Sequence, residues 1–336
     1  MSVISSLFIL FSCTQESKES GVTITGEAQG TTYTIILPDE HVDLRKSEID
    51  SILQRFDESL STYLPTSTIS ILNADKDSVS VSDPTGYFQG CYQISQEVFQ
   101  RTEGAFDPSV YPLVKGWGFT DKVETPLDSA TVDSLLQYVS FKEDDLFEIS
   151  FGNQITLLKK DGFKFDFNAV AQGYSVDVLA EHLDKKRIKD YYIEIGGELR
   201  VKGKNREGQD WRIGIDSPIA DPQTRELENI LNLSDKAVAT SGNYRNFYEK
   251  DGVKYAHTLN PKTGWPVQHS LLSATVVTND CARADAYATA FMVVGVDAAM
   301  QMASDSKDEI EVYLLYADED GELARTYSNG FEKYLK

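Results

Sequence analysis

Cysteine is scarce in this chain, with three cysteines among 336 residues. None of them forms a CxxC pair or stands at metal-ligand spacing from a histidine, which argues against a zinc site. Cys91 and Cys281 lie far apart in the sequence. We interpret both as buried thiols, with a disulfide between them as the alternative in an exported protein.

Basic side chains are also in short supply, because 32 lysines and arginines stand against 53 aspartates and glutamates, a net charge of −21. Proteins that bind nucleic acid generally need a basic surface, so the composition argues against a nucleic-acid partner. The simpler interpretation of the acid excess is solubility. An anionic ligand would need help from a helix N-terminus, a basic residue or a metal ion.

Long apolar runs are missing after the first residues, so no later segment is predicted to span a bilayer. Val3–Phe11 is a short apolar run that leads into Ser12 and Cys13. This start resembles the lipobox of bacterial lipoproteins, in which the cysteine is lipidated, although no Lys or Arg precedes it. We expect residues 1–21 to be a signal and polar tether, anchored to a membrane through Cys13. Residues 22–336 would form the functional domain, as one unit or two intimately packed lobes; the alternative is a disordered start with a chance cysteine.

The stretch Phe163–Asp177 organises the rest of the chain. Its phenylalanines alternate at positions 163, 165 and 167, which predicts a half-buried strand. From Ala169 the apolar residues recur at helical spacing to about Leu183, which predicts a helix with Asn168 as its N-cap. A strand that runs directly into a helix presents free backbone N–H groups, and therefore a site for an anion.

Asp166 is expected at the mouth of this anion site. A carboxylate there would repel a phosphate unless a cation lay between them. The arrangement therefore suggests a phosphate ligand held through a metal ion. The alternative is an ordinary strand–helix junction with a solvated aspartate.

A candidate metal-ligand pair lies further along, where Asp285 and Thr289 stand four residues apart on one face of a predicted helix. A carboxylate and a hydroxyl are hard oxygen ligands that suit Mg²⁺ or Ca²⁺. The alternative is an aspartate that stabilises the helix N-terminus and a threonine that is only packed.

Histidine is rare, with four in the chain. His257 follows a predicted hairpin strand among threonine and glycine residues, and of the four it alone is placed like a catalytic acid or base. A structural histidine is the alternative. His41, His182 and His269 lie in polar surroundings and are interpreted as surface residues.

Helical periodicity and strand alternation are mixed along the chain, and the strands come in hairpins, so the predicted class is α+β, with mixed and antiparallel sheets and packed helices. Asp216–Glu228 is polar and holds two prolines, which predicts a loop. The other predicted helices are 46–60, 86–102, 130–139, 280–294 and 297–304. The predicted strands and hairpins are 22–37, 147–158, 191–195, 199–204, 211–215, 238–241, about 251–252, 272–278 and about 318–321.

Nine short motifs carry a resemblance to a known family. They are GTTY at 30–33, LSTY at 60–63, GAFDP at 104–108, GWGF at 116–119, DFNAVAQGY at 166–174, IGGE at 195–198, TSGNYR at 240–245, HTLNPKTG at 257–264 and ADAYATA at 284–290. In this order the set resembles the FAD:protein FMN transferase family, the ApbE-type flavin transferases, over about residues 26–295. The resemblance implies an ApbE-like fold and an Mg²⁺-dependent enzyme that transfers the FMN moiety of FAD to a Thr or Ser of an acceptor protein and releases AMP.

The resemblance also implies roles for particular residues. It places the metal ligands at Asp285, Thr289 and the backbone oxygen of Ala169, and we assign the activation of the acceptor hydroxyl to His257. The implied FAD contacts are Gln29, Tyr63, Ala105, Phe106, Asp107, Asp166, Gln172 and Leu259. Three residues depart from the family pattern: Gln172 replaces a charged residue, Asn260 follows the histidine where Asp is usual, and Gln29 replaces an apolar residue.

Two alternatives to the transferase remain at this stage. One is an Mg²⁺-dependent FAD pyrophosphatase that gives FMN and AMP, and the other is a non-catalytic FAD-binding lipoprotein. If Cys13 is lipidated, we expect the protein at a bacterial cell envelope, anchored to a membrane and facing the periplasm. By family analogy its acceptors would be flavin-carrying subunits of membrane electron-transport complexes.

Overall fold

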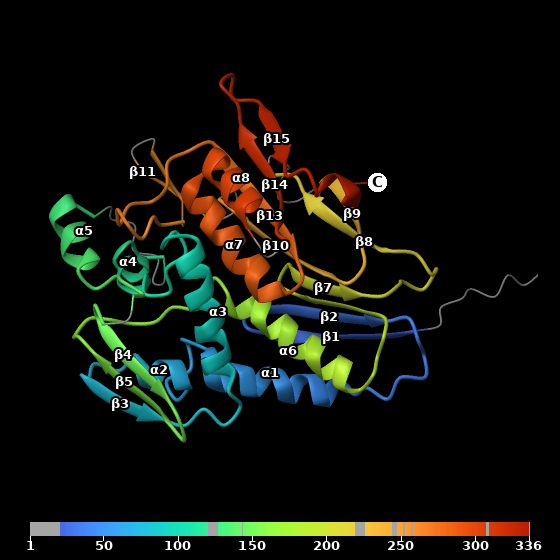
Figure 1. The fold of residues 1–336 in the computed structure, drawn as a ribbon, viewed down its shortest axis with the longest axis horizontal. Coiled ribbons are helices and arrows are strands. Elements are labelled where there is room, and N and C mark those ends of the chain that lie inside the picture. The colour runs from blue at the N-terminus through green and yellow to red at the C-terminus, as the bar shows by residue number, and fades with distance from the viewer. Residues whose placement is uncertain are drawn as a thin grey trace, which may run out of the picture.

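A computed structural model describes residues 21–119, 127–142, 144–218, 226–243, 247–250, 253–256, 258–306 and 309–335. An antiparallel sheet of eight strands forms its centre (Figure 1). In spatial order the strands are β1 (Val22–Ala28), β2 (Thr31–Leu37), β6 (Tyr191–Ile195), β7 (Glu198–Lys202), β10 (Lys236–Gly242), β13 (Leu271–Thr278), β14 (Glu311–Ala317) and β15 (Leu323–Tyr327). The sheet thus brings strands from both ends of the chain together.

Alternation along the strands divides this sheet into two apolar faces. On one face Ala239 and Val276 pack in a cluster with residues of helix α7 (Cys281–Val294). Helix α6 (Ala171–Lys185) lies beside α7. Helix α1 (Lys46–Leu60) lies on the side of α6 that faces away from α7 (Figure 1). Helix α8 (Val296–Asp305) follows α7.

The opposite face of the large sheet is covered by a two-stranded hairpin. Its strands are β8 (Trp211–Asp216) and β9 (Leu227–Leu233), and the short 3₁₀ helix η1 (Glu332–Tyr334) lies next to β9. Trp211 and Leu231 pack with Val238 and Val277, the neighbours in sequence of the residues that face α7. The period-2 pattern of the central strands is therefore apolar on both sides.

A smaller three-stranded sheet stands at one end, in the order β3 (Ser78–Val81), β5 (Ile155–Lys159) and β4 (Phe147–Phe151). Helix α2 (Thr68–Leu72) packs on β3, and helix α3 (Tyr87–Arg101) packs on α7 (Figure 1). One hydrophobic cluster runs from the small sheet through α3 to α7. The remaining elements are α4 (Tyr111–Gly116), α5 (Ser129–Leu136) and the hairpin of β11 (Phe247–Lys250) and β12 (Val253–Ala256).

The predicted α+β class is confirmed, and most predicted elements are present within one or two residues. The helix predicted at 46–60 has these same bounds. The loop predicted at 216–228 is wrong at its end, because β9 begins at Leu227 and pairs with β8. The turn predicted at 251–252 lies outside the described residues. Among the described helices, none combines the length and hydrophobicity needed to cross a bilayer.

The strand predicted at 163–167 is wrong, although all three phenylalanines are buried. The backbone of this segment is paired with side chains and loops instead of a sheet. The Phe165 N–H donates to Asn73 Oδ1 at 2.7 Å, and Asn73 Nδ2 donates to the Phe165 carbonyl at 2.8 Å. The Asp166 N–H donates to the Pro108 carbonyl at 2.6 Å. An asparagine amide therefore takes the place of a neighbouring strand.

The start of the following helix also differs from the prediction. A turn occupies residues 168–170, and α6 begins at Ala171 with Val170 as its N-cap. Asn168 is exposed and is not the N-cap. In this turn the Phe167 carbonyl accepts from the backbone N–H groups of both Val170 and Ala171, and the helix begins two residues later than predicted.

Candidate active site

The first turn of α6 is pressed against α7, and Gly173 makes this contact possible. A Cβ at this position would lie 2.3 Å from the Cys281 carbonyl oxygen and 2.9 Å from the Asp285 Cβ. The Gly173 N–H donates to Asp285 Oδ2 at 3.1 Å. The N-terminus of α6 therefore binds the protein's own Asp285 carboxylate, at the place where the sequence predicted a site for a phosphate.

Asp285 and Thr289 lie on one face of α7, as predicted. Asp285 is 6% exposed, and burial raises its pKa to about 7 against the opposing effect of the Gly173 hydrogen bond. Among the described residues no lysine or arginine forms an ion pair with it. The Thr289 hydroxyl lies 3.3 Å from the Ser241 hydroxyl on β10. The pair therefore joins α7 to both α6 and the sheet.

Helix α7 is held in place by a buried aspartate on α6. Asp177 accepts hydrogen bonds from the backbone N–H groups of Cys281 at 3.0 Å and Ala282 at 2.8 Å. Its carboxylate also receives Arg200 Nη1 of β7 at 2.7 Å. Asp177 caps the positive end of α7 and fixes the position of Asp285 one turn later.

A second carboxylate, that of Glu198, belongs to this site and was missed as a site residue by sequence reasoning. Its Oε2 atom is buried and has no hydrogen-bond partner among the described residues. Burial is the larger cause that raises the pKa of Glu198 well above its usual value, and the negative charge of Asp285 is the second. The available signal was the IGGE motif, in which Glu198 follows a two-glycine turn.

The backbone oxygen of Ala169 is also open to a ligand. In a regular helical turn the Gly173 N–H would donate to this carbonyl, but it donates to Asp285. Ala169 is half-buried, next to the N-cap of α6. Ala169 and Asp285 are therefore linked through one residue, Gly173, whereas Thr289 lies one turn further along α7.

These residues fit a hard divalent cation. They offer carboxylate, hydroxyl and carbonyl oxygens, and the negative charge of Asp285 and Glu198 has no basic partner among the described residues. No cluster of three or more His, Cys, Asp or Glu side chains with ligand spacing occurs in the described part of the chain. A cation here would complete its coordination with water or ligand oxygens, as Mg²⁺ does on a diphosphate.

Two predicted FAD contacts, Gln29 and Gln172, meet at the same helix start. Gln172 Nε2 donates to the Ile195 carbonyl at 2.8 Å, which ties α6 to the turn between β6 and β7. Gln29 has a positive φ of 55° and accepts from Ser175 Oγ at 3.3 Å. Its Nε2 atom is buried and has no partner among the described residues. This N–H₂ group is a free donor for a ligand.

Two glycines beside these glutamines line open space. A Cβ added to Gly30 (φ 75°) or Gly197 (φ 115°) would have no neighbour within 4 Å. Both conformations are disfavoured for other residues, so a bare backbone here leaves room for a ligand to approach.

The predicted contacts at Asp166 and 105–107 lie in a more buried layer. Asp166 is 8% exposed and accepts from the Asn168 N–H at 2.9 Å; burial raises its pKa. The alternative of a solvated aspartate is therefore wrong. Asp107 is held by the backbone N–H and hydroxyl of Ser109, and burial raises its pKa. Ala105 and Phe106 are buried in the main core.

The remaining predicted FAD contacts, Tyr63 and Leu259, lie in two different environments. Tyr63 is 82% exposed, so it is not a core tyrosine and presents its ring to solvent. Leu259 is buried in a small cluster with Leu113 and Trp117. His257 lies outside the described residues. The other three histidines do not share one environment: His41 is exposed, whereas His182 is only partly exposed.

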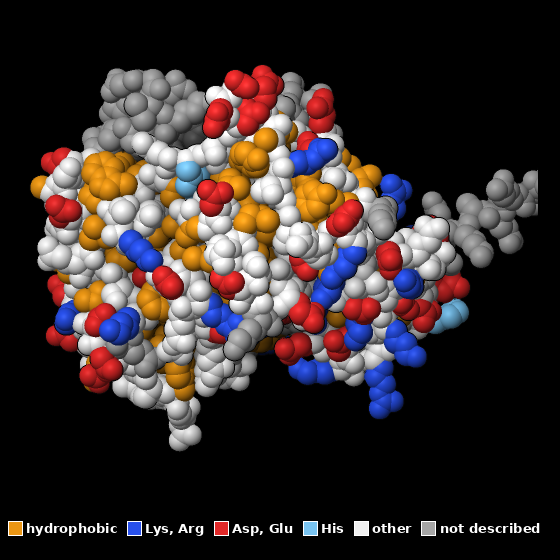
Figure 2. Space-filling model, turned by 45° about the horizontal axis from the view of Figure 1, so that its top comes forward, with side chains coloured by type: hydrophobic (Ala, Val, Ile, Leu, Met, Phe, Trp, Pro, Cys, Tyr) orange, Lys and Arg blue, Asp and Glu red, His pale blue; other side chains and the backbone are white. Residues whose placement is uncertain are grey.

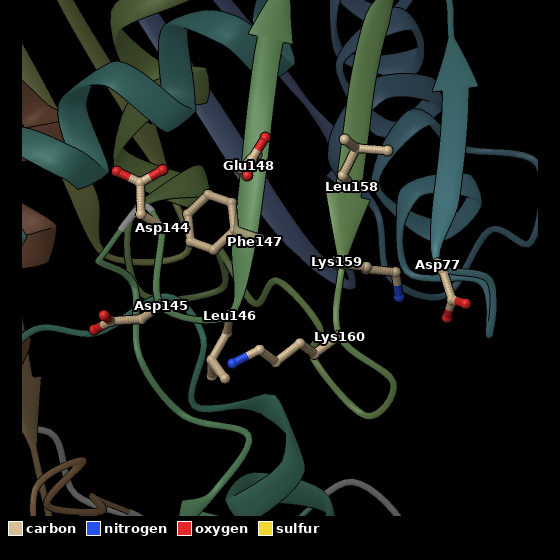
Figure 3. A pocket seen from close by; sticks show the side chains of 9 residues that line it. All are labelled: Asp77, Asp144, Asp145, Leu146, Phe147, Glu148, Leu158, Lys159 and Lys160. Carbon is tan, nitrogen blue, oxygen red and sulfur yellow. The ribbon is translucent and has the colours of Figure 1, made fainter.

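An open pocket of about 250 Å³ lies elsewhere, at the edge of the small sheet (Figure 3). It is lined by Asp77, Asp144, Asp145, Leu146, Phe147, Glu148, Leu158, Lys159 and Lys160. The buried Lys159 ammonium donates to the Phe163 carbonyl at 3.0 Å, and burial lowers its pKa. None of the candidate site residues lines this pocket, so it is separate from the site at α6 and α7.

Comparison with known proteins decides the family. The profile of the ApbE family matches residues 29–314, which is most of the chain. This chain belongs to the ApbE family. Among its relatives, the FAD:protein FMN transferase of Vibrio cholerae is 33% identical, with 99% of this chain and 97% of the relative covered. That of Haemophilus influenzae is 31% identical, with 96% and 94% covered.

Solved ApbE structures have the same fold. The flavin transferase ApbE from Vibrio cholerae matches with a TM-score of 0.81 at 32% identity, covering 94% of this chain and 99% of that one. The apo form of the Pseudomonas stutzeri flavinyl transferase ApbE also gives a TM-score of 0.81, at 28% identity, with 94% and 97% covered. The ApbE-like fold and family expected from the motifs are therefore confirmed.

Proposed function

We propose that this ApbE-family protein transfers the FMN moiety of FAD to a Thr or Ser hydroxyl of an acceptor protein. The observation that carries the proposal is a pair of carboxylates beside the N-terminus of α6: the buried Asp285, and the half-buried Glu198, whose Oε2 atom is buried. Together with family membership, this arrangement suits a nucleotide diphosphate that arrives with Mg²⁺.

The chemistry is a displacement at the phosphorus of the FMN half. The acceptor oxygen forms a new P–O bond, the bond between the two phosphates of FAD breaks, and AMP leaves with the electron pair. His257 takes the hydroxyl proton of the acceptor. Asp285, Thr289 and the Ala169 carbonyl would hold Mg²⁺, which would offset the negative charge that develops on the departing phosphate.

The residues of the chain bind and orient. Asp285, Thr289 and the Ala169 carbonyl would hold the cation in this proposal, and the cation rather than the α6 backbone would face the phosphates. The unpartnered Gln29 amide donates to the nucleotide. The exposed Tyr63 ring offers an aromatic face on which the flavin ring stacks. Ala105, Phe106, Asp107, Asp166, Gln172 and Leu259 form the walls of the FAD site.

The proposed setting is the cell envelope. Lipidation at Cys13 would anchor the protein to a membrane, facing the periplasm, and its acceptors would be flavin-carrying subunits of membrane electron-transport complexes. Cys13 lies outside the described residues.

On the face shown in Figure 2, lysines and arginines are scattered among aspartates and glutamates instead of gathering into a basic stripe.

The test is to mix the purified protein with FAD, Mg²⁺ and an acceptor domain that bears a target threonine. Intact mass spectrometry reads the acceptor, and chromatography reads the small molecules. An acceptor heavier by one FMN residue, with AMP released, supports the transferase. Free FMN and AMP with an unmodified acceptor indicate an FAD pyrophosphatase instead, and intact FAD throughout indicates a binding protein.

A further inference from the structure

Strand β7 presents a ladder of charged side chains to helix α6. Residues 198, 200 and 202 alternate with the buried Leu199 and Val201, whose side chains belong to the cluster on the opposite face of the sheet. Two rungs of this ladder are ion pairs with α6: Lys202 with Asp184 at 2.8 Å and Arg200 with Asp177 at 2.7 Å.

The third charged position on β7, residue 198, does not form an ion pair with α6 among the described residues. At this position the strand carries an acid, Glu198. Strand β7 packs against α7, and the charges that act on Glu198 are those of two other acids, Asp285 of α7 and Glu194 of β6. The Gly173 N–H of α6 is already donated to Asp285. Glu198 Oε2 is buried and unpartnered among the described residues. Two buried negative groups without a basic partner are costly, and a cation is the species that removes this cost.

From this rung we infer that Glu198 is a positioning residue for the divalent cation, acting beside Asp285 and setting how tightly the cation is held. The inference deepens the proposed function and rests on its metal site. A ligand can approach the turn before Glu198, because a Cβ added to Gly197 would meet no atom within 4 Å. Outer-shell carboxylates of this kind typically change metal affinity by about 10–100-fold when they are lost.

The hairpin between β6 and β7 also supplies a matched control. Glu194 stands directly opposite Leu199 in the strand register, whereas Glu198 stands opposite Ile195. Directly opposed residues share a face, so Glu194 and Glu198 lie on opposite faces of the sheet. Glu194→Gln removes one negative charge from the same hairpin and leaves the Glu198 side chain in place, and its amide oxygen can still accept from the Gly197 N–H, as Glu194 Oε1 does at 2.8 Å.

The experiment measures the binding of Mg²⁺ alone, by titration calorimetry, to the wild-type protein and to Glu198→Gln, Glu198→Asp and Glu194→Gln. We expect Glu198→Gln to weaken Mg²⁺ binding at least about 10-fold, Glu198→Asp to recover part of the loss, and Glu194→Gln to stay within about twofold. Melting temperatures in EDTA show whether each variant is folded.

Three outcomes overturn the inference in different ways. Wild-type Mg²⁺ affinity in a folded Glu198→Gln overturns the role of Glu198 alone, and leaves the metal site and the proposed function intact. Equal losses of Mg²⁺ affinity in Glu198→Gln and Glu194→Gln would show a general effect of negative charge, and would also overturn the inference about Glu198. If the wild type binds no Mg²⁺ either alone or with FAD, the metal site itself fails, and this inference fails with it.

Discussion

The buried charge of Asp285 makes a quantitative prediction about stability. Its pKa of about 7 in the folded, metal-free protein compares with an ordinary aspartate value of about 3.9. The difference is about 3 pH units, and at 1.36 kcal/mol per unit it corresponds to about 4 kcal/mol. This is the penalty for holding the carboxylate ionised where it is 6% exposed and has no cation beside it.

The sign follows from proton linkage. Between pH 4 and 7 the unfolded chain releases the Asp285 proton before the folded protein does, so the folded state binds more protons and its stability falls as the pH rises. Below pH 4 the full stability is present, and above pH 7 the loss is complete. Asp285→Asn abolishes this dependence, because an amide does not ionise and its oxygen can still accept from the Gly173 N–H.

In EDTA at pH 8 we therefore expect Asp285→Asn to be more stable than the wild type, by up to about 4 kcal/mol, and the difference to vanish near pH 4. Mg²⁺ should narrow this difference: at 100-fold above its Kd it adds about 2.7 kcal/mol to the wild type and nothing to the variant, which should also lose turnover. The assay is urea unfolding at pH 4, 6 and 8 with EDTA or Mg²⁺, with Asp297→Asn, an exposed aspartate on α8, as the control. If Asp285→Asn is no more stable than the wild type at pH 8 in EDTA, the argument that Asp285 carries a buried, uncompensated charge is refuted.

Three further predictions address the helix contact, the chemistry and the ligand. Gly173→Ala should cost about 2–3 kcal/mol in urea unfolding and weaken Mg²⁺ binding, because its methyl group overlaps the Cys281 carbonyl; unchanged stability would contradict the packing of α6 on α7. His257→Ala should slow FMN transfer in single-turnover kinetics more than it weakens FAD binding, and the reverse would place His257 in the pocket wall. Tyr63→Ala should weaken FAD binding about 10-fold by fluorescence titration while changing stability by less than about 0.5 kcal/mol, because the side chain is 82% exposed; a large loss of stability would show that it packs.

The metal pair illustrates what spacing alone could establish. Four residues on a helix place Asp285 and Thr289 on one face whatever the rest of the fold does, because the helical repeat is local. The same holds for the helix at 46–60, whose periodic apolar face fixed both of its ends in the prediction. Ordered family motifs added the likeness to known flavin transferases, and with it the fold.

The segment at 163–167 shows where local pattern failed. Its alternation is genuine, since all three phenylalanines are buried, but alternation does not say what the backbone pairs with. Asn73, which lies 92 residues earlier, supplies both hydrogen bonds to Phe165. The strand β9 was missed for a related reason, since its residues become a strand by pairing with β8 and not through a strong pattern of their own.

The sequence by itself determined the helices, most of the strands, the acid excess and the candidate ligands on α7, because these depend on composition and on short-range periodicity. Only the tertiary structure decided that α6 meets α7 at Gly173, and that Glu198 lies with Asp285 in a place without a basic partner. Burial and charge compensation depend on residues far apart in the chain: Glu198 and Asp285 come from different elements and meet only when β7, α6 and α7 pack together. The physical property that makes this site suited to a cation is therefore a product of folding, although every residue in it can be read in the sequence.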